Sequence, residues 1–230
     1  MCGRFTYTFT WKQLHRLMEL TDWPEVELAP RFNVAPSQDA PVIRQREDGT
    51  RTGSMLRWGL IPSWADDAAI GNRLINARGE TVAEKPAFRS AFAKRRCIVP
   101  ISGFYEWKKI EGEKRKQPYW IGRKDREPFA LAGLWERWSK GEEPIDSFTL
   151  ITTEPNALMA TLHDRMPVIL DPGAFARWLD PAQTDVGALQ SLIRPAPDEA
   201  FEVYPVSTRV NSPANDDPEL VARVEASWDR

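Results

Sequence analysis

The chain opens with MCGRFTYTFT, which places one of its two cysteines directly behind the initiator methionine. One interpretation is a frayed chain end whose thiol has no role. The other is that removal of Met1 leaves Cys2 with a free α-amine and a thiol on adjacent carbons. Such a 1,2-aminothiol captures aldehydes, because the amine forms an imine and the thiol then adds to the imine carbon. An internal cysteine has no free amine and cannot do this.

Other reactive or amide side chains occur in short stretches that also contain glycine or proline. Glu106 lies in a predicted aromatic strand, where a buried carboxylate needs a partner. His163 follows a predicted short helix and precedes Asp164 and Arg165, whereas His15 lies on the first predicted helix and is expected to be structural or solvent-facing. The six stretches are MCGRF (1–5), RFNVAP (31–36), RWGLIPSW (57–64), INARGE (75–80), GFYEW (103–107) and HDRMP (163–167).

Taken singly, these stretches leave several kinds of site open. Cys2, His163 and Asn33 are the residue types of a thiol peptidase, although no spacing favours that triad over another. Asn33 could equally be a turn residue, and the arginines could form ordinary salt bridges. Two cysteines and two histidines without paired spacing do not predict a zinc site. The sequence contains no glycine-rich phosphate loop.

Read together and in this order, the six stretches resemble the SRAP family, the SOS response-associated peptidases, now described as abasic-site processing proteins. The resemblance runs from MCGRF to YPVSTRVNSPAN (204–215) and includes RCIVPISGFYEWKK (96–109), KQPYWI (116–121) and LITTEPN (150–156). It implies a single α+β domain over residues 1–230, with a twisted, barrel-like, mostly antiparallel sheet flanked by short helices and a positively charged groove. It also implies covalent capture of abasic sites in single-stranded DNA through Cys2, with no cofactor and no metal.

The resemblance carries roles to individual positions. The motif residue between Arg78 and Glu80 is Gly79, where the family more often has serine or alanine, and we expect little effect on activity. The catalytic positions implied are Cys2, Asn33, Glu106 and His163. The DNA-contacting positions implied are Arg4, Pro36, Trp58, Asn76, Arg78 and Arg165, with Trp58 and Pro36 as base-stacking or wedge residues.

These residue types suit the implied chemistry. An abasic site exists partly as a ring-opened aldehyde at C1′, and an α-amine with a reference pKa of about 7.7–8.0 is roughly one-tenth neutral near pH 7. Glu106 is expected to move protons near the amine and O4′, and His163 to protonate the sugar oxygen or activate the thiol. Asn33 cannot titrate and is expected to orient Cys2 or the sugar. Arginines would hold the phosphates on both sides of the lesion.

Three alternatives compete with this interpretation. Cys2 could act as the nucleophile of a thiol peptidase, including one that removes its own Met1. An imine intermediate could allow β-elimination, which gives a weak abasic-site lyase. The protein could also be a single-stranded-DNA binding module in which Cys2 is incidental.

Composition sets the remaining expectations. The 230-residue chain has a formal net charge of −2, so any contact with nucleic acid must use a local cluster of arginines. No basic segment followed by an apolar run opens the chain, and no long apolar run occurs, so neither a signal peptide nor a membrane partner is expected. Two cysteines without a disulfide pattern predict the reducing cytoplasm, with association with the nucleoid when bound to DNA. A monomer is expected. Most of the ten tryptophans are expected in the core, and an exposed subset could stack on bases.

The elements that must position these residues are short. A helix is predicted over 11–20 with Thr10 as its cap, followed by a hairpin of strands 41–46 and 55–60 that turns through Asp48-Gly49. The residues after position 209 predict a polar, loosely held C-terminal tail (210–230). The further strands predicted are 97–109, 117–123, 128–138, 147–154 and 201–207, and the further helices are 85–96, 156–162, 172–179 and 186–193.

Overall fold

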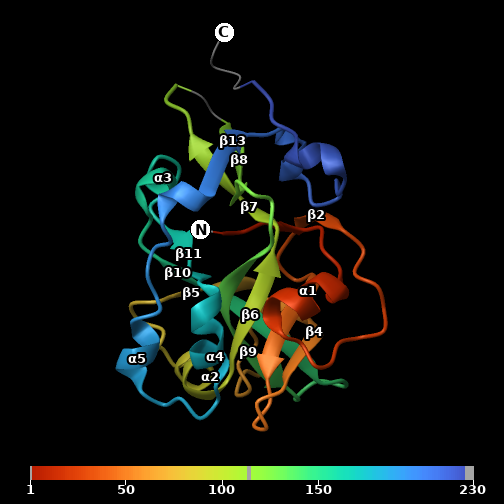
Figure 1. Cartoon of the computed structure of the whole chain (residues 1–230), viewed down its shortest axis with the longest axis vertical. Helices are drawn as coiled ribbons and strands as arrows, with labels where there is room; N and C mark the ends of the chain where they lie inside the picture. The colour runs from red at the N-terminus through yellow and green to blue at the C-terminus, as the bar shows by residue number, and fades with distance from the viewer. Residues whose placement is uncertain (1, 113–114, 226–230) are drawn as a thin grey trace.

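The computed structural model describes residues 2–112 and 115–225, and its strands form two sheets (Figure 1). All neighbours in the first sheet are antiparallel. Its five strands occur in the order β13 (Phe201–Pro205), β8 (Lys116–Arg123), β7 (Gly103–Lys109), β1 (Phe5–Tyr7) and β2 (Arg31–Val34).

The second sheet closes on itself, because β10 pairs with both β4 and β9. The β4–β10 pairing is parallel and the other pairings around this ring are antiparallel. The ring consists of β3 (Asp39–Gln45), β4 (Arg51–Trp58), β6 (Arg96–Ile101), β9 (Phe129–Trp138) and β10 (Ile145–Thr153). Three short strands join it: β5 (Asn76–Arg78), β11 (Met166–Pro167) and β12 (Ile169–Leu170). The predicted α+β fold with a barrel-like, mostly antiparallel sheet is confirmed.

The local sequence signals of the first helix and hairpin are present in the structure. Thr10 caps α1 (Trp11–Met18), and its side chain and that of Gln13 form a capping box. The hairpin β3–β4 turns through Gly49, whose φ of 85° lies in the left-handed region that glycine adopts without a side-chain clash.

The other helices are shorter than the sequence predicts. They are α2 (Arg89–Lys94), α3 (Ala157–Ala160), α4 (Phe175–Leu179) and α5 (Val186–Gln190). Short 3-10 helices add η1 (Ala68–Arg73), η2 (Pro172–Ala174), η3 (Asp198–Ala200), η4 (Thr208–Asn211) and η5 (Pro218–Val221).

The single strand predicted over 97–109 is wrong, because the chain changes sheets at Ser102. Residues up to Ile101 pair with β9 in the barrel, whereas Gly103 pairs with β1 in the five-stranded sheet. The N–H of Ser102 donates to the carbonyl of Thr6 in β1 at 2.8 Å, which begins the new pairing. This switch places Glu106 on the five-stranded sheet, beside the N-terminal segment.

The N-terminal segment runs between the two sheets (Figure 1), and Cys2 and Phe5 belong to the main hydrophobic core. Residues 210–225 pack beside Tyr105, Trp120 and Tyr204 of the five-stranded sheet, in a second apolar cluster. Val210 and Leu220 are fully buried there. The predicted loosely held tail is therefore wrong for residues 210–225, since buried apolar side chains anchor it; residues 226–230 lie outside the described part of the chain.

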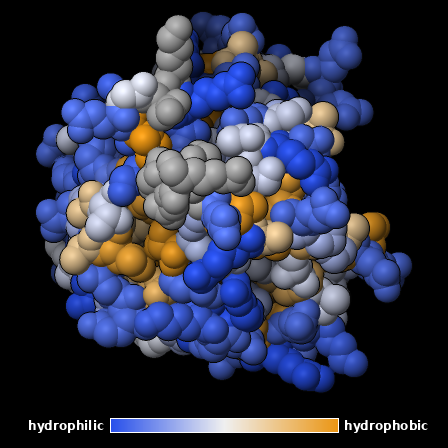
Figure 2. All heavy atoms as spheres, turned by 90° about the horizontal axis from the view of Figure 1, so that it is seen from above, coloured by the Kyte–Doolittle hydropathy of each residue, from blue (hydrophilic) through white to orange (hydrophobic). Residues whose placement is uncertain are grey.

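Seen from above, the end of the molecule that carries the five-stranded sheet is largely hydrophilic, with hydrophobic side chains showing in separate patches (Figure 2). Among the described residues, no helix has the length and apolar character needed to cross a membrane.

Candidate functional site

The backbone around Cys2 is held from two sides. The segment before β1 continues beside β7, because the N–H of Tyr105 donates to the carbonyl of Arg4 at 3.0 Å. From the other side, Asn76 in β5 donates from its Nδ2 to the carbonyl of Cys2 at 2.9 Å. Asn76 is placed there by the parallel pairing of β5 with β10, in which Asn76 lies opposite Leu150. Cys2 is therefore fixed between the barrel and the five-stranded sheet.

The thiol of Cys2 is fully buried. Burial raises its pKa well above the ordinary value, and the negative charge of Glu106 raises it further. The Sγ atom donates a long hydrogen bond, at 3.9 Å, to the carbonyl of Arg4. The thiol is thus protonated at neutral pH, and a thiolate nucleophile is disfavoured.

A cleft of about 460 Å³ brings together three of the predicted site residues, Arg4, Glu106 and His163, while the buried Cys2 is not among its lining residues. Its other lining residues are Trp107, Lys116 and Asn211. Reasoning from sequence did not single out these three, although each lies in a stretch that carries the family resemblance. The guanidinium of Arg4 lies 5.9 Å from the centroid of the Trp107 ring, which is a cation–π contact.

His163 follows α3, and its N–H donates to the carbonyl of Met159 at 2.9 Å. The N–H of Arg165 donates to Nδ1 of His163 at 3.0 Å, so in the neutral ring Nε2 carries the proton. The exposed carboxylate of Asp164 lies 2.7 Å from the same Nδ1, so it is the acceptor that a ring protonated at Nδ1 would use. The ring is three-quarters buried and lines the cleft.

The arginines predicted to bind phosphate differ in their surroundings. Arg78 is exposed on β5. Arg165 instead forms a two-point ion pair with Glu80, at 2.5 and 2.9 Å, and donates to the carbonyl of Thr152 at 2.8 Å. These hydrogen bonds lower the pKa of Glu80 below its ordinary value. The ion pair ties the INARGE and HDRMP stretches together, so Arg165 also has a structural role.

Asn33 is fully buried, and its side chain bonds Arg4 and the C-terminal segment. Its Oδ1 accepts a hydrogen bond from Arg4 at 2.8 Å. Its Nδ2 donates to the carbonyls of Val210, Ser212 and Asn215. The side chain that holds the Cys2 backbone is that of Asn76, and orientation of the sugar by Asn33 stays a prediction.

Trp58 is fully buried and therefore cannot stack on a base in this structure. The expectation that it is a base-stacking residue is wrong. Its ring packs against Phe5 and Phe148, and its Nε1 donates to the carbonyl of Ile75 at 3.0 Å. In the same stretch, Trp64 is 54% exposed. Pro36 is half-buried in a turn after β2.

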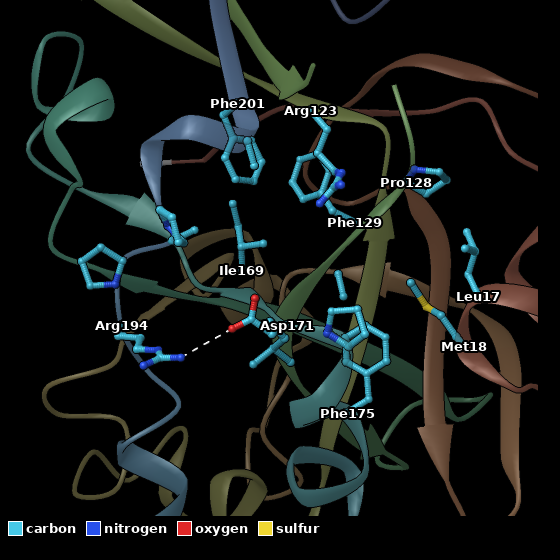
Figure 3. Close-up of a pocket in the computed structure, with 17 residues that line it drawn as sticks. Leu17, Met18, Arg123, Pro128, Phe129, Ile169, Asp171, Phe175, Arg194 and Phe201 are labelled. Atoms are coloured by element: carbon cyan, nitrogen blue, oxygen red, sulfur yellow. Dashed lines mark hydrogen bonds and ion pairs between the residues drawn. The ribbon is translucent and has the colours of Figure 1, made fainter. Parts of the chain in front are cut away.

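A second, more enclosed cavity of about 380 Å³ lies apart from these residues (Figure 3). Phe129, Phe175 and Phe201 line it, together with four prolines. Its charged pair, Arg194 and Asp171, is exposed and 3.5 Å apart. The lining holds no cysteine or histidine, and it shares no residue with the cleft that Arg4, Glu106 and His163 line.

Among the described residues, no group of three or more histidines, cysteines, aspartates or glutamates could hold a metal ion.

Fold and site together define a single-domain α+β protein in which Cys2 is buried close to the carboxylate of Glu106, and in which Glu106, a histidine and an arginine line one cleft. The model of the SOS response associated peptidase (SRAP) family matches residues 1–213, and the chain belongs to this family.

Known relatives agree with this assignment. The chain is 46% identical over 223 residues to the abasic site processing protein YoqW of Bacillus subtilis, covering 96% of this chain and 99% of that one. It is 32% identical over 267 residues to the abasic site processing protein HMCES of Gallus gallus, covering 98% and 78%. A crystal structure of a protein from Bacteroides thetaiotaomicron, 31% identical, superposes with a TM-score of 0.75 over 84% of this chain and 85% of that one.

Proposed function

We propose that this protein processes abasic sites, and that it does so by binding single-stranded DNA and cross-linking covalently to the lesion through Cys2. The observation that carries the proposal is the fixed position of Cys2 close to Glu106, which lines one cleft with Arg4 and His163. The names of the relatives support an abasic site as the lesion that this protein processes, because several are abasic site processing proteins.

The proposed reaction balances as a condensation. Hydrolysis of the Met1–Cys2 peptide bond consumes one water and frees the α-amine. Its nitrogen attacks C1′ of the ring-opened sugar, and the carbinolamine then loses one water to give an imine. The thiol sulfur adds to the imine carbon, and the thiol proton ends on the nitrogen. The product is a five-membered thiazolidine, equal to the protein without Met1 plus the DNA less one water.

The state of the thiol favours this order of events over a peptidase mechanism. A thiol peptidase needs a thiolate to attack the peptide carbonyl. Burial and the charge of Glu106 both raise the pKa of the Cys2 thiol, and so oppose its ionisation. An amine that attacks first needs no thiolate, because the imine carbon is electrophilic enough to receive the sulfur afterwards. Self-removal of Met1 and a weak lyase activity through the imine remain secondary proposals.

We assign proton transfer to the two titratable side chains of the cleft. The carboxylate of Glu106 would take protons from the attacking amine and return one when the carbinolamine loses water. His163 would protonate the sugar oxygen as the ring opens. Arg4 and the exposed Arg78 would contact phosphates. Lys116, at the rim of the cleft, adds positive charge next to them.

The test uses single-stranded DNA with one abasic site. The parent protein should give an adduct that survives heating on a denaturing gel, and Cys2→Ala should give none. A binding module without covalent chemistry would bind this DNA and leave no heat-stable adduct. A peptidase would release Met1 only when Glu106 and His163 are intact, whereas removal of Met1 by an aminopeptidase would not depend on them.

A further inference from the structure

The segment from Thr208 to Asp217, which we call the C-terminal strap, reaches the cleft at one residue. Asn211 of the strap lines the cleft, and its Oδ1 accepts a hydrogen bond from Nε1 of Trp107 at 2.7 Å. Val210 anchors the strap, since its side chain is fully buried against the five-stranded sheet. Asp216 fixes the other end, because its carboxylate pairs with Arg31 and accepts from the N–H of Phe32 at 2.5 Å.

The strap holds the guanidinium of Arg4 without neutralising it. Nη1 of Arg4 donates to the carbonyl of Val210 at 2.7 Å and to Oδ1 of Asn33 at 2.8 Å. Nη2 donates to the carbonyl of Asn211 at 3.3 Å. All three acceptors are uncharged, and none of the ion pairs between described residues includes Arg4. Arg4 therefore lines the cleft without a direct ion pair to a carboxylate of the described residues.

Asn33 links the strap to Arg4. Its Nδ2 donates to the carbonyls of Val210, Ser212 and Asn215 at 3.2, 3.0 and 2.8 Å, so its nitrogen must face the strap and its Oδ1 must face Arg4. The site therefore requires a donor on one side and an uncharged acceptor on the other. An aspartate has the same shape but would meet three carbonyl oxygens and would cancel the charge of Arg4.

We propose that Asn33 is a positioning residue, which anchors the C-terminal strap and orients Arg4 while leaving its full positive charge for a DNA phosphate. The inference rests on the proposed binding of DNA, but not on the covalent step. It explains why an amide lies at this buried position without contacting Cys2, and it makes the strap part of the binding site.

The test measures reversible binding in the Cys2→Ala protein, using single-stranded DNA with a tetrahydrofuran analogue that has no aldehyde. Affinity is measured by fluorescence anisotropy over a range of salt concentrations. Loss of one phosphate contact to a single strand lowers the slope of log affinity against log salt by about 0.7. We expect Asn33→Asp and Arg4→Met each to lower the slope by about this amount. We expect Asn33→Asp to have no further effect on the slope when Arg4→Met is already present.

A merely structural role for Asn33 predicts a different result. Asn33→Asp would then lower the melting temperature and leave the slope unchanged, or its effect would add to that of Arg4→Met, and either outcome overturns the inference. If Asn33→Asp does not fold, Asn33→Ser replaces it, because serine keeps the site uncharged and can still donate to one carbonyl. Asn33→Ser should weaken binding in the parent and not in the Arg4→Met background; equal weakening in both overturns the inference.

The result is separable from the proposed cross-link. A slope change with no heat-stable adduct from the intact protein would contradict the cross-link and support the role of Asn33. Binding by the Cys2→Ala protein that does not depend on salt would contradict the role of Asn33, whatever the outcome of the cross-linking test.

Discussion

The side chain of Asn76 holds the backbone of Cys2, through a 2.9 Å hydrogen bond from its Nδ2 to the Cys2 carbonyl. In the proposed reaction Cys2 carries both nucleophiles once Met1 is removed, so loss of this bond should misplace the amine relative to the sugar. We expect Asn76→Leu to slow cross-linking by roughly 10- to 100-fold, since small misplacements at a reacting centre have effects of this size. Single-turnover rates of cross-linking at saturating DNA measure this loss of rate. Gln190→Ala, which removes an exposed amide on α5, is the control, and equal rates for Asn76→Leu and the parent would refute the role.

Glu106 should govern the rate of cross-linking and not the affinity for DNA. Glu106→Gln keeps the size of the side chain but cannot accept and return a proton, and general acid–base groups contribute typically about 10²- to 10⁴-fold. We expect a loss in this range in the single-turnover rate, with the dissociation constant for the tetrahydrofuran DNA changed less than about threefold. Glu199→Gln, an exposed carboxylate, should match the parent. Unchanged cross-linking by Glu106→Gln would remove it from the mechanism.

Two tryptophans of the RWGLIPSW stretch should behave in opposite ways. Trp64 is largely exposed, and if it stacks on a base its replacement by alanine should weaken binding by about 1–3 kcal/mol. Trp58 is a buried core residue, and Trp58→Ala should instead destabilise the fold by about 3–5 kcal/mol. DNA titrations and urea unfolding separate the two effects. Trp23→Ala, which removes another exposed tryptophan, is the control for a general loss of aromatic surface. The same affinity for DNA in Trp64→Ala, Trp58→Ala and Trp23→Ala would exclude stacking at Trp64.

The ion pair between Arg165 and Glu80 predicts a pH dependence of stability. Hydrogen bonds from Arg165 lower the pKa of Glu80 in the folded protein below its ordinary value of 4.5. The pair therefore stabilises the fold above the unfolded pKa, and this contribution is lost as the pH falls through the folded pKa. Because Glu80 is about half exposed, the contribution is at most about 1 kcal/mol.

Thermal melts of the parent and Glu80→Gln measure this contribution. We expect the parent to be the more stable at pH 7, and the two proteins to converge as the pH falls through the lowered pKa of Glu80 and the carboxylate is protonated. A difference in melting temperature that persists unchanged at low pH would show that the carboxylate charge of Glu80 does not contribute.

Much of the fold could be predicted because its signals are local. Thr10 and Gln13 define the start of α1, and Gly49 defines the β3–β4 turn. The change of sheet at Ser102 could not be predicted, because β6 and β7 read as one apolar strand and only the partner strands differ. The short strand β5 could not be predicted for a similar reason. Its three residues form a strand because they pair with β10, more than 70 positions away.

The candidate site shows the same division. Cys2, Glu106 and His163 could be chosen from residue type and resemblance, and the structure brings them to one cleft region. The contact of Asn76 with Cys2 and the contacts of Asn33 with the strap depend on pairings across the whole chain, so they could not be predicted from the sequence. The cytoplasmic location and the monomeric state stay predictions.

The most direct test of the account is the intact mass of the adduct with abasic single-stranded DNA. The account predicts the mass of the protein without Met1 plus the DNA less one water, with the linkage mapped to Cys2. A variant with one alanine inserted between Met1 and Cys2 keeps every internal side chain but separates the amine from the thiol, and it should give no heat-stable adduct. A heat-stable adduct of that variant, or a linkage mapped to any other residue, would contradict the account.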